Sequence, residues 1–250
     1  MGYYNYQNGL IYRHLHQEGG WDEHLEKCRN YILNSIGSYS PDKVTIIGSG
    51  WLLDLPLAEM LEITKKVCLI DIIHPPEVIS QVKSLHNVEL IEADVTGGLI
   101  EEVWKKAREK TFSKNIGSVF EINIPEFIPG SDPGMIVSLN IMTQLESLLV
   151  DFLKKKSDIG EEELKIFRKQ IQQKHLSLLN KYLSVLICDY EEVYIDKTGN
   201  LNPTATLLAD IPTGKNREEW IWKFDLKQSD FYNKRSFLKI MALILNNEKI

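Results

Sequence analysis

The sequence predicts an α/β protein with a doubly wound, mostly parallel sheet of the seven-stranded type, antiparallel C-terminal strands and an N-terminal helical cap. Two observations support this fold class. From residue 44 to residue 189, short apolar runs alternate with helical segments, which is typical of a parallel sheet covered by helices. After residue 189, strand-like runs follow one another with turn signals such as Pro212-Thr213-Gly214 between them, which is typical of antiparallel strands.

The helical cap is expected to occupy residues 1–40, ahead of a single α/β domain at residues 41–250. Within residues 21–36, apolar side chains recur at spacings of three and four and form the single stripe of an amphipathic helix: Trp21, Leu25, Cys28, Ile32 and Ile36. Gly37 is expected to end this helix. A shorter helix is predicted at 9–17, with a glycine hinge after it.

The alternating region predicts five strands, each an apolar run bounded by turn residues, at 44–48, 67–71, 88–93, 135–139 and 183–189. Helices are expected between these strands, at about 54–63, 76–84 and 97–109 and over 145–182, with a break near 157–160. Pro56 suits the first turn of the first crossover helix, and Asp54 is expected to cap that helix rather than to bind a ligand.

The C-terminal part is expected to be rich in β structure, at 204–211, 219–226 and 235–245. Before it, residues 111–134 interrupt the alternation, because they carry three prolines and are longer than an ordinary connection. This segment is either a surface excursion or part of a substrate wall, and the sequence favours neither.

Composition narrows the classes of partner. The net charge is −6, and the basic run Lys154–Lys156 is followed at once by acidic residues, so no nucleic-acid partner is expected. No apolar run approaches membrane-span length and the N-terminus lacks a signal-peptide pattern, so a cytoplasmic location is expected. The three cysteines are far apart and lack metal-ligand spacing, so neither a disulfide framework nor a metal site is expected.

The most informative segment is the turn Gly48-Ser49-Gly50 between a predicted strand and a helix-like segment. Glycines let a backbone approach a ligand closely, and a helix start offers unpaired N–H groups. Asp71, at the end of the next strand, lies 21 residues beyond Gly50, which is the spacing that lets a carboxylate reach a ribose. The pattern predicts a site for a nucleotide-type cofactor.

These elements resemble, in order, the motifs of the class I S-adenosylmethionine-dependent methyltransferases. Residues 48–50 look like the glycine-rich first motif, and Asp71 looks like the acidic residue after the second strand. Residues 92–95 resemble the third-strand motif, and residues 138–145 stand where the family has its fourth-strand motif. The resemblance covers about residues 40–190, and it implies S-adenosylmethionine as the cofactor.

The resemblance also implies the residues of a cofactor site: Gly48, Ser49, Gly50, Trp51, Asp71, Ile72, Asp94, Val95 and Asn140. In it, Asp71 would hold the ribose, Asp94 the adenine, and the backbone of residues 48–50 the methionine end. Two positions depart from the family pattern: Ile46 stands where an acidic residue is usual, and Leu52 stands in place of the third glycine. The fourth-strand motif also lacks the form found in enzymes that methylate amino groups of bases or glutamine.

Several of these residues have a structural alternative. Asp71 could cap the segment that begins at Pro75, and Asp94 could serve the turn before Thr96. Asn140 and Gln144 could face the methyl donor or bond to backbone, and Trp51 could cover the cofactor or wedge the helix. Two histidines of the cap, His14 and His16, are candidates for substrate binding together with Gln144, although surface positions are commoner for such residues.

The function predicted from the sequence is methyl transfer from S-adenosylmethionine to a small-molecule acceptor. One alternative is a catalytically silent protein that binds the cofactor or a partner. A second alternative is an NAD(P)-dependent oxidoreductase, but Leu53 stands where its fingerprint requires glycine. The sequence predicts no catalytic residue, and it leaves the acceptor and the oligomeric state open.

Overall fold

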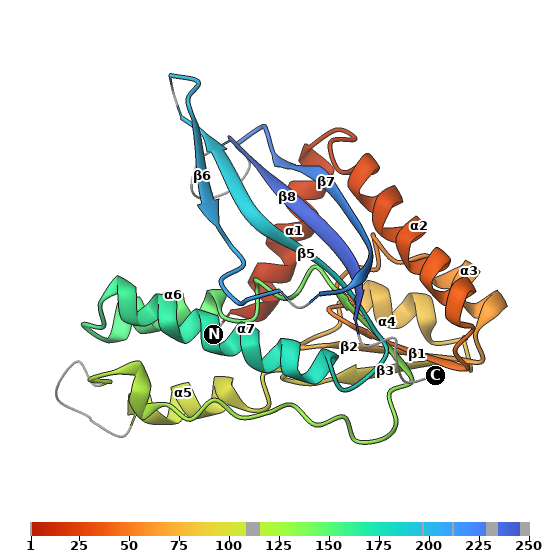
Figure 1. The fold of residues 1–250 in the computed structure, drawn as a ribbon, viewed down its shortest axis with the longest axis horizontal. Coiled ribbons are helices and arrows are strands. Elements are labelled where there is room, and N and C mark those ends of the chain that lie inside the picture. Colours follow the sequence, from red (N-terminus) through yellow and green to blue (C-terminus); the bar gives the residue numbers. More distant parts are fainter. Residues whose placement is uncertain (1, 109–115, 197, 212, 229–234, 246–250) are drawn as a thin grey trace.

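A computed structural model describes residues 2–108, 116–196, 198–211, 213–228 and 235–245 (Figure 1). Its strands are β1 (Lys43–Ile47), β2 (Lys66–Asp71), β3 (Val88–Glu92), β4 (Met135–Leu139), β5 (Ser184–Ile195), β6 (Leu201–Ala205), β7 (Lys215–Asp225) and β8 (Arg235–Leu245). Its α-helices are α1 (Tyr3–His16), α2 (Asp22–Tyr39), α3 (Leu57–Ile63), α4 (Pro76–Val82), α5 (Leu99–Arg108), α6 (Ser147–Lys156) and α7 (Glu161–Leu179).

The described strands form one sheet in the order β3-β2-β1-β4-β5-β8-β7, with β6 paired to the distal half of β5. The first five strands in this order are parallel, whereas β8 is antiparallel to both β5 and β7. The prediction of a mostly parallel sheet with an antiparallel ending is therefore confirmed. The long strands β5, β7 and β8 extend beyond the shorter strands β1 to β4, as Figure 1 shows.

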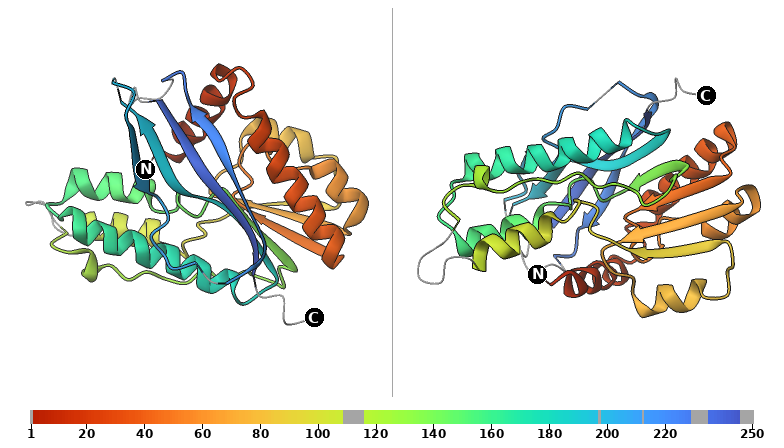
Figure 2. Two further views of the ribbon diagram at one scale, coloured as in Figure 1. Left: turned by 45° about the horizontal axis from the view of Figure 1, so that its top comes forward. Right: turned by 90° about the horizontal axis from the view of Figure 1, so that it is seen from below.

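Helices cover both faces of the sheet (Figures 1 and 2), as in a doubly wound fold. Strand side chains alternate between two cores: Ile46 packs in a cluster with residues of α2, α3 and α4, whereas Ile47 packs in a cluster with residues of α7. A third cluster joins α5, α6 and α7. The inner strands β1, β2 and β4 are buried on both faces, so their sequences are mostly apolar runs, whereas the edge strand β3 is only partly buried.

Several predicted boundaries were wrong. The helix α2 continues past Gly37 to Tyr39, and α1 begins at Tyr3 rather than near residue 9. The strand predicted at 204–211 is instead β6, which ends at Ala205. Asp54 does not cap the first crossover helix, because α3 begins after Pro56 without a side-chain cap and the Asp54 carboxylate binds elsewhere.

The described part of the 111–134 segment, from residue 116 onward, packs against the molecule. Ile116, Val119 and Ile122 are buried in the cluster formed by α5, α6 and α7, and a 3₁₀ turn spans Val119–Glu121. Residues 111–115 lie outside the described residues. No helix in the described part of the chain combines the length and apolar character needed to cross a lipid bilayer.

Candidate functional site

Two adjoining cavities lie at the carboxyl ends of the parallel strands, where the strand order reverses between β1 and β4. Ligands of open α/β sheets bind at this switch point. The β2–β3 cavity is lined by residues that follow those two strands, from Ile70 to Ile72 and from Ala93 to Thr96. The glycine-loop cavity is lined by residues 48–51, by Asp54, and by residues of α1, α2, β4 and β7.

The two cavities adjoin, because they share part of their lining. Each encloses about 590 Å³ of space between atoms, part of it open to solvent. Gln7, Gly48, Asp71, Ile141 and Gln144 line both. An elongated ligand could therefore lie across the ends of β1, β2 and β4, with one end in each cavity.

The glycine loop is shaped by close contacts with β4 as well as by the cavity. Gly48 has φ +88°, and a Cβ at this position would lie 2.7 Å from the carbonyl oxygen of Leu139 and from Cβ of Ile141. Gly50 also has positive φ, but a Cβ there would meet only Oε1 of Gln7, at 3.9 Å. Gly48 is thus required by packing, whereas Gly50 faces open space in the cavity.

Leu52, at the end of the glycine loop, has an unusual backbone conformation for a residue with a side chain. Its φ is +59°, in the left-handed region that side chains disfavour. The side chain is buried in the core below the loop, which offsets the backbone strain. The loop therefore holds a left-handed turn at Leu52 without a glycine there.

Asp71 joins the end of β2 to the glycine loop. Its Oδ2 accepts a hydrogen bond from the Gly50 backbone N–H at 2.8 Å, and its Oδ1 accepts from the Ile72 N–H at 2.8 Å. Nε2 of Gln7 lies 3.3 Å from Oδ1. Burial raises the pKa of Asp71, and the backbone hydrogen bonds partly oppose this rise. The alternative cap is not seen, because α4 begins after Pro75 without a side-chain cap.

The helix α1 covers the cavities from the N-terminal side. Tyr3, Tyr6 and Gln7 line the β2–β3 cavity, and Gln7 and Leu10 line the glycine-loop cavity. Nε1 of Trp51 donates to the carbonyl oxygen of Gln7 at 2.9 Å. Trp51 thus fastens the covering helix to the loop while lining the cavity.

Asp94 serves the turn after β3. Its Oδ1 accepts a hydrogen bond from the Thr96 N–H at 2.9 Å, and its Oδ2 accepts from the Ile100 N–H at 3.2 Å. The residue also lines the β2–β3 cavity, together with Ile72 and Val95. The turn alternative is therefore realised, and Asp94 keeps a place beside any ligand in that cavity.

Asn140 follows β4 with φ +50° and points its amide at Asp54. Its Nδ2 donates to Oδ2 of Asp54 at 2.7 Å, and its backbone oxygen accepts from Nε2 of Gln144 at 2.6 Å. Both alternatives for Gln144 thus coexist, since it bonds to backbone and also lines both cavities.

The two cap histidines lie away from the cavities. Nδ1 of His16 lies 2.8 Å from the carbonyl oxygen of Tyr12 on the exposed side of α1. The His14 ring lies 5.2 Å from the Trp21 ring, and burial lowers its pKa. Neither residue is among those that line the two cavities, so they are not carried into the functional site.

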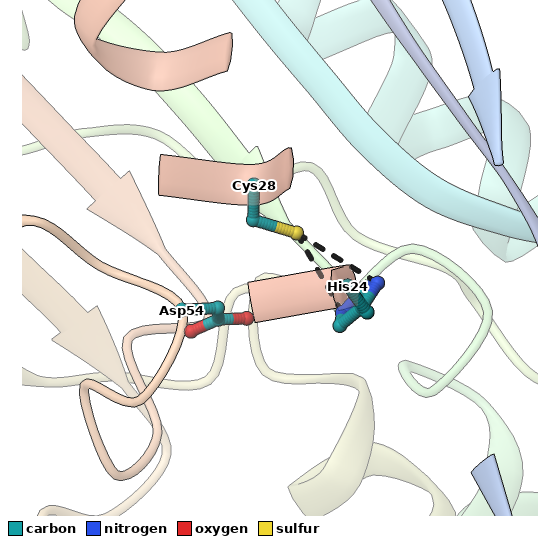
Figure 3. A group of neighbouring side chains, drawn as sticks. All are labelled: His24, Cys28 and Asp54. Atoms are coloured by element: carbon teal, nitrogen blue, oxygen red, sulfur yellow. Dashed lines mark hydrogen bonds between the residues drawn. The ribbon is translucent and has the colours of Figure 1, made fainter. Parts of the chain in front are cut away.

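The structure reveals a polar cluster that the sequence analysis missed. His24, Cys28 and Asp54 lie beside one another, as Figure 3 shows, with potential ligand atoms all within 4.8 Å of one another, and His24 and Asp54 line the glycine-loop cavity. The available signal was His24 and Cys28 four residues apart on one helical stripe. The partner, Asp54, is distant in sequence and could not be paired with them without the fold.

This cluster does not fit a metal ion as it is arranged. The indole N–H of Trp220, which can only donate, lies 3.0 Å from Nδ1 of His24. The amide nitrogen of Asn140, which is also a donor, lies 3.2 Å from Nε2, and Sγ of Cys28 lies 3.6 Å from the same atom, so donors stand against both ring nitrogens. Burial lowers the pKa of His24 to about 3 and raises that of Cys28, so the pair offers a neutral ring and a thiol.

Asp54 is the charged member that reaches the cavity. It is half-buried and lines the cavity, and burial raises its pKa. The hydrogen bond from Asn140 partly opposes that rise, and so does the charge of Arg29. The nearby Asp71 carboxylate adds to the rise, so two like charges face one ligand space.

No family model matches this chain, and no curated protein matches it. Similar solved structures include N-methyltransferase NodS from Bradyrhizobium japonicum WM9 with S-adenosylhomocysteine, at 11% identity and TM-score 0.38, covering 87% of this chain and 86% of that chain. Another is a Burkholderia thailandensis 1,6-didemethyltoxoflavin-N1-methyltransferase, at 10% identity and TM-score 0.42, covering 98% and 90%. A third is a putative RNA methyltransferase from Pyrococcus horikoshii, at 8% identity and TM-score 0.37, covering 86% and 78%. At TM-scores below 0.5, these similarities assign neither activity nor substrate to this chain.

Proposed function

We propose that this protein transfers a methyl group from S-adenosylmethionine to a small-molecule acceptor. The observation that carries the proposal is the pair of adjoining cavities at the β1–β4 switch point, with Asp71 in the lining of both. An adenosyl ligand with a charged tail has the same two-part form. The motif order in the sequence independently favours this ligand.

The residues divide the ligand between the cavities. The apolar β2–β3 cavity, with Ile72, Val95 and Ile141 in its lining, suits an adenine ring. Asp71, shared by both cavities, has oxygens within reach of a ribose and would accept hydrogen bonds from the sugar hydroxyls alongside the one from Gln7. The glycine loop then takes the methionine end, where Gly50 leaves the backbone open to a ligand.

Catalysis in this proposal comes from positioning. S-adenosylmethionine supplies, when bound, a methyl group on a sulfonium sulfur, which an acceptor lone pair takes in line while the carbon–sulfur bond breaks. The chain's part is to hold donor and acceptor at near-attack distance and to exclude water. The covering helix α1, fixed through Gln7 to Asp71 and through Trp51 to the loop, suits that role. The net charge of −6 favours a small acceptor over a nucleic acid.

A silent binding protein is the second candidate, because no side chain in the cavities is required as a nucleophile. The departure at Ile46 keeps this reading open, since that buried strand residue brings no carboxylate to the site. An oxidoreductase is less well supported, because Leu53 stands at the third glycine of its fingerprint and the left-handed turn ends at Leu52.

Thermal denaturation with cofactors tests the proposal. A ligand that binds only the native state stabilises it by mass action and so raises the melting temperature. At a ligand concentration one hundred times the dissociation constant, the free energy of unfolding rises by about 2.7 kcal/mol. We expect S-adenosylmethionine and S-adenosylhomocysteine to stabilise the protein, and NAD and NADP to leave it unchanged. Stabilisation by a nicotinamide cofactor alone would overturn the proposal. Stabilisation by S-adenosylmethionine without methyl transfer to any member of a broad acceptor panel would favour the silent binder.

A further inference from the structure

We propose that the glycine-loop cavity is an ammonium-binding site in which Asp54, oriented by Asn140, is the anionic anchor. This inference deepens the proposed function, because it assigns a chemical class to the group held beside the glycine loop. It also explains how the site can work with Ile46 where the resembling family has a carboxylate.

The charged residues that line the glycine-loop cavity are all acidic. Asp54 and Asp71 both line it, and none of the described residues in its lining is lysine or arginine. Arg29 donates to the carbonyl oxygen of Leu53 from an exposed position and does not line the cavity. Two carboxylates that share one space repel each other, and a cation between them relieves that repulsion.

Unpartnered oxygens point to the same chemistry. Oδ1 of Asn140 and Oε1 of Gln7 are buried and have no hydrogen-bond partner, although each residue is more than nine-tenths buried and lines the cavity. Their orientation is fixed, because the amide nitrogen of Asn140 donates to Asp54 and that of Gln7 donates to Asp71. Flipping either amide would place an oxygen against a carboxylate.

Both amides therefore present acceptors that need a donor. An unsatisfied buried acceptor is costly, and a primary ammonium supplies three donors and no acceptor. Ser49 adds a buried hydroxyl without a partner. The unpartnered indole N–H of Trp222, which an ammonium cannot use, would suit a carboxylate on the same ligand.

Aromatic rings complete the cavity wall. Trp21, Trp51 and Trp222 line it, and His24 stacks on Trp222 with ring centres 3.9 Å apart and planes within 1°. Aromatic faces attract cations, most strongly where water is excluded. The neutral His24 ring beneath Asp54 adds no positive charge that would compete with the ligand.

An ammonium could come from either of two sources, and the first experimental arm tests the cofactor. Titration calorimetry would compare three ligands: S-adenosylhomocysteine, S-adenosyl-3-thiopropylamine, which keeps only the amine, and methylthioadenosine, which lacks the tail. We expect the wild-type protein to bind the amine analogue at least tenfold more tightly than methylthioadenosine. Asp54→Asn should remove this preference by lowering the affinity for the amine analogue roughly 10- to 100-fold. The affinity for methylthioadenosine should stay unchanged.

The second arm tests an amine acceptor. The protein saturated with S-adenosylhomocysteine would be titrated with a panel of small primary alkylamines. If the acceptor supplies the ammonium, Asp54→Asn should weaken amine binding by a similar factor and leave the affinity for all three adenosyl ligands unchanged. Asp54→Glu, which keeps the charge, should restore binding in whichever arm responds.

The control is Asp42→Asn, the same change at an exposed carboxylate that pairs with Lys65 on the surface. It should change the affinities measured in neither arm.

The inference is overturned if Asp54→Asn, with an unchanged melting temperature, changes neither the preference for the amine analogue over methylthioadenosine nor the binding of alkylamines. It is also overturned if Asp54→Asn weakens the binding of methylthioadenosine as much as that of the amine analogue. If no adenosyl ligand binds the wild-type protein, the proposed function fails. The ammonium site is then tested with the amine panel on the ligand-free protein. Binding by the wild-type protein that is lost in Asp54→Asn supports the site, and no binding by the wild-type protein refutes it.

Discussion

At the scale of single residues, Asp71 has two roles that the sequence could not separate. It accepts hydrogen bonds from the backbone N–H groups of Gly50 and Ile72 without any ligand, so it stabilises the loop as well as facing both cavities. Asp71→Ala should weaken adenosyl-ligand binding by roughly 10- to 100-fold, and leaving buried donors unpaired should cost roughly 1–3 kcal/mol of stability.

Asp71→Asn separates these roles, because it keeps one acceptor oxygen and removes the charge. It should weaken binding nearly as much as Asp71→Ala while costing less stability. Calorimetric titration with S-adenosylhomocysteine and urea unfolding of both variants measure the two quantities. An unchanged dissociation constant in both variants would remove Asp71 from the site.

The two loop glycines should respond differently to substitution. Gly48→Ala would place a Cβ 2.7 Å from the carbonyl oxygen of Leu139, so the backbone must shift. Gly50→Ala meets no such contact and should cost only the left-handed backbone penalty, about 1–2 kcal/mol. Urea unfolding should show the larger loss for Gly48→Ala. Equal losses would contradict the packing role assigned to Gly48.

At the scale of elements, one buried carboxylate links α6 to α7. Oε1 of Glu146 accepts from Nε of Arg168 at 3.2 Å and from Nε2 of Gln172 at 3.1 Å, while its Oε2 has no partner. Oε1 of Gln172 in turn accepts from the Leu208 N–H at 2.7 Å. Burial raises the pKa of Glu146 to about 7, and Arg168 opposes this only in part.

This shift predicts a pH dependence of stability. Between about pH 4.5 and about pH 7, Glu146 stays protonated in the folded protein but loses its proton in the unfolded chain. The contribution of Glu146 to the free energy of unfolding therefore falls across this pH range, by on the order of 3 kcal/mol. Glu146→Gln cannot titrate, so its stability relative to the wild-type protein should improve between pH 5 and pH 8. Urea unfolding at both values tests this, with Glu161→Gln on the exposed start of α7 as the control. Parallel profiles for Glu146→Gln and the wild-type protein would contradict it.

The elements also show which parts of the fold were readable. The strands β1 to β4 were predicted to within one residue, because most of them are buried apolar runs, whereas β5 continues to Ile195, six residues past its predicted end. The C-terminal strand β6 was misplaced, because its sequence is exposed and polar and its position depends on pairing with the far end of β5. Gly37 failed as a helix end, because a glycine on an exposed helix face costs only about 1 kcal/mol.

At the scale of the whole molecule, the site divides into a predictable and an unpredictable part. The ten residues assigned to the cofactor or to the donor side, from Gly48 to Gln144, line the two cavities, because strand ends and the glycine turn fix their place. The contributions of α1, His24 and Asp54 could not be foreseen. They depend on how the N-terminal helices meet the loop, and no local pattern encodes that meeting.

The charge of the molecule gives a further expectation. With a net charge of −6, the protein should show no appreciable binding to duplex DNA or structured RNA at physiological salt, because such binding depends on neutralising phosphates. A gel-shift titration measures this. Sub-micromolar, salt-sensitive binding would show that the acceptor class is a nucleic acid and would replace the small-molecule proposal.

The most direct test of the central claim is a crystal structure with S-adenosylhomocysteine. The account predicts one ligand across the β1–β4 switch point, with the adenine beside Val95, the ribose hydroxyls on Asp71, and the methionine end against the glycine loop. Electron density for the ligand outside the two cavities, or an unoccupied switch point in crystals grown at millimolar ligand, would contradict it.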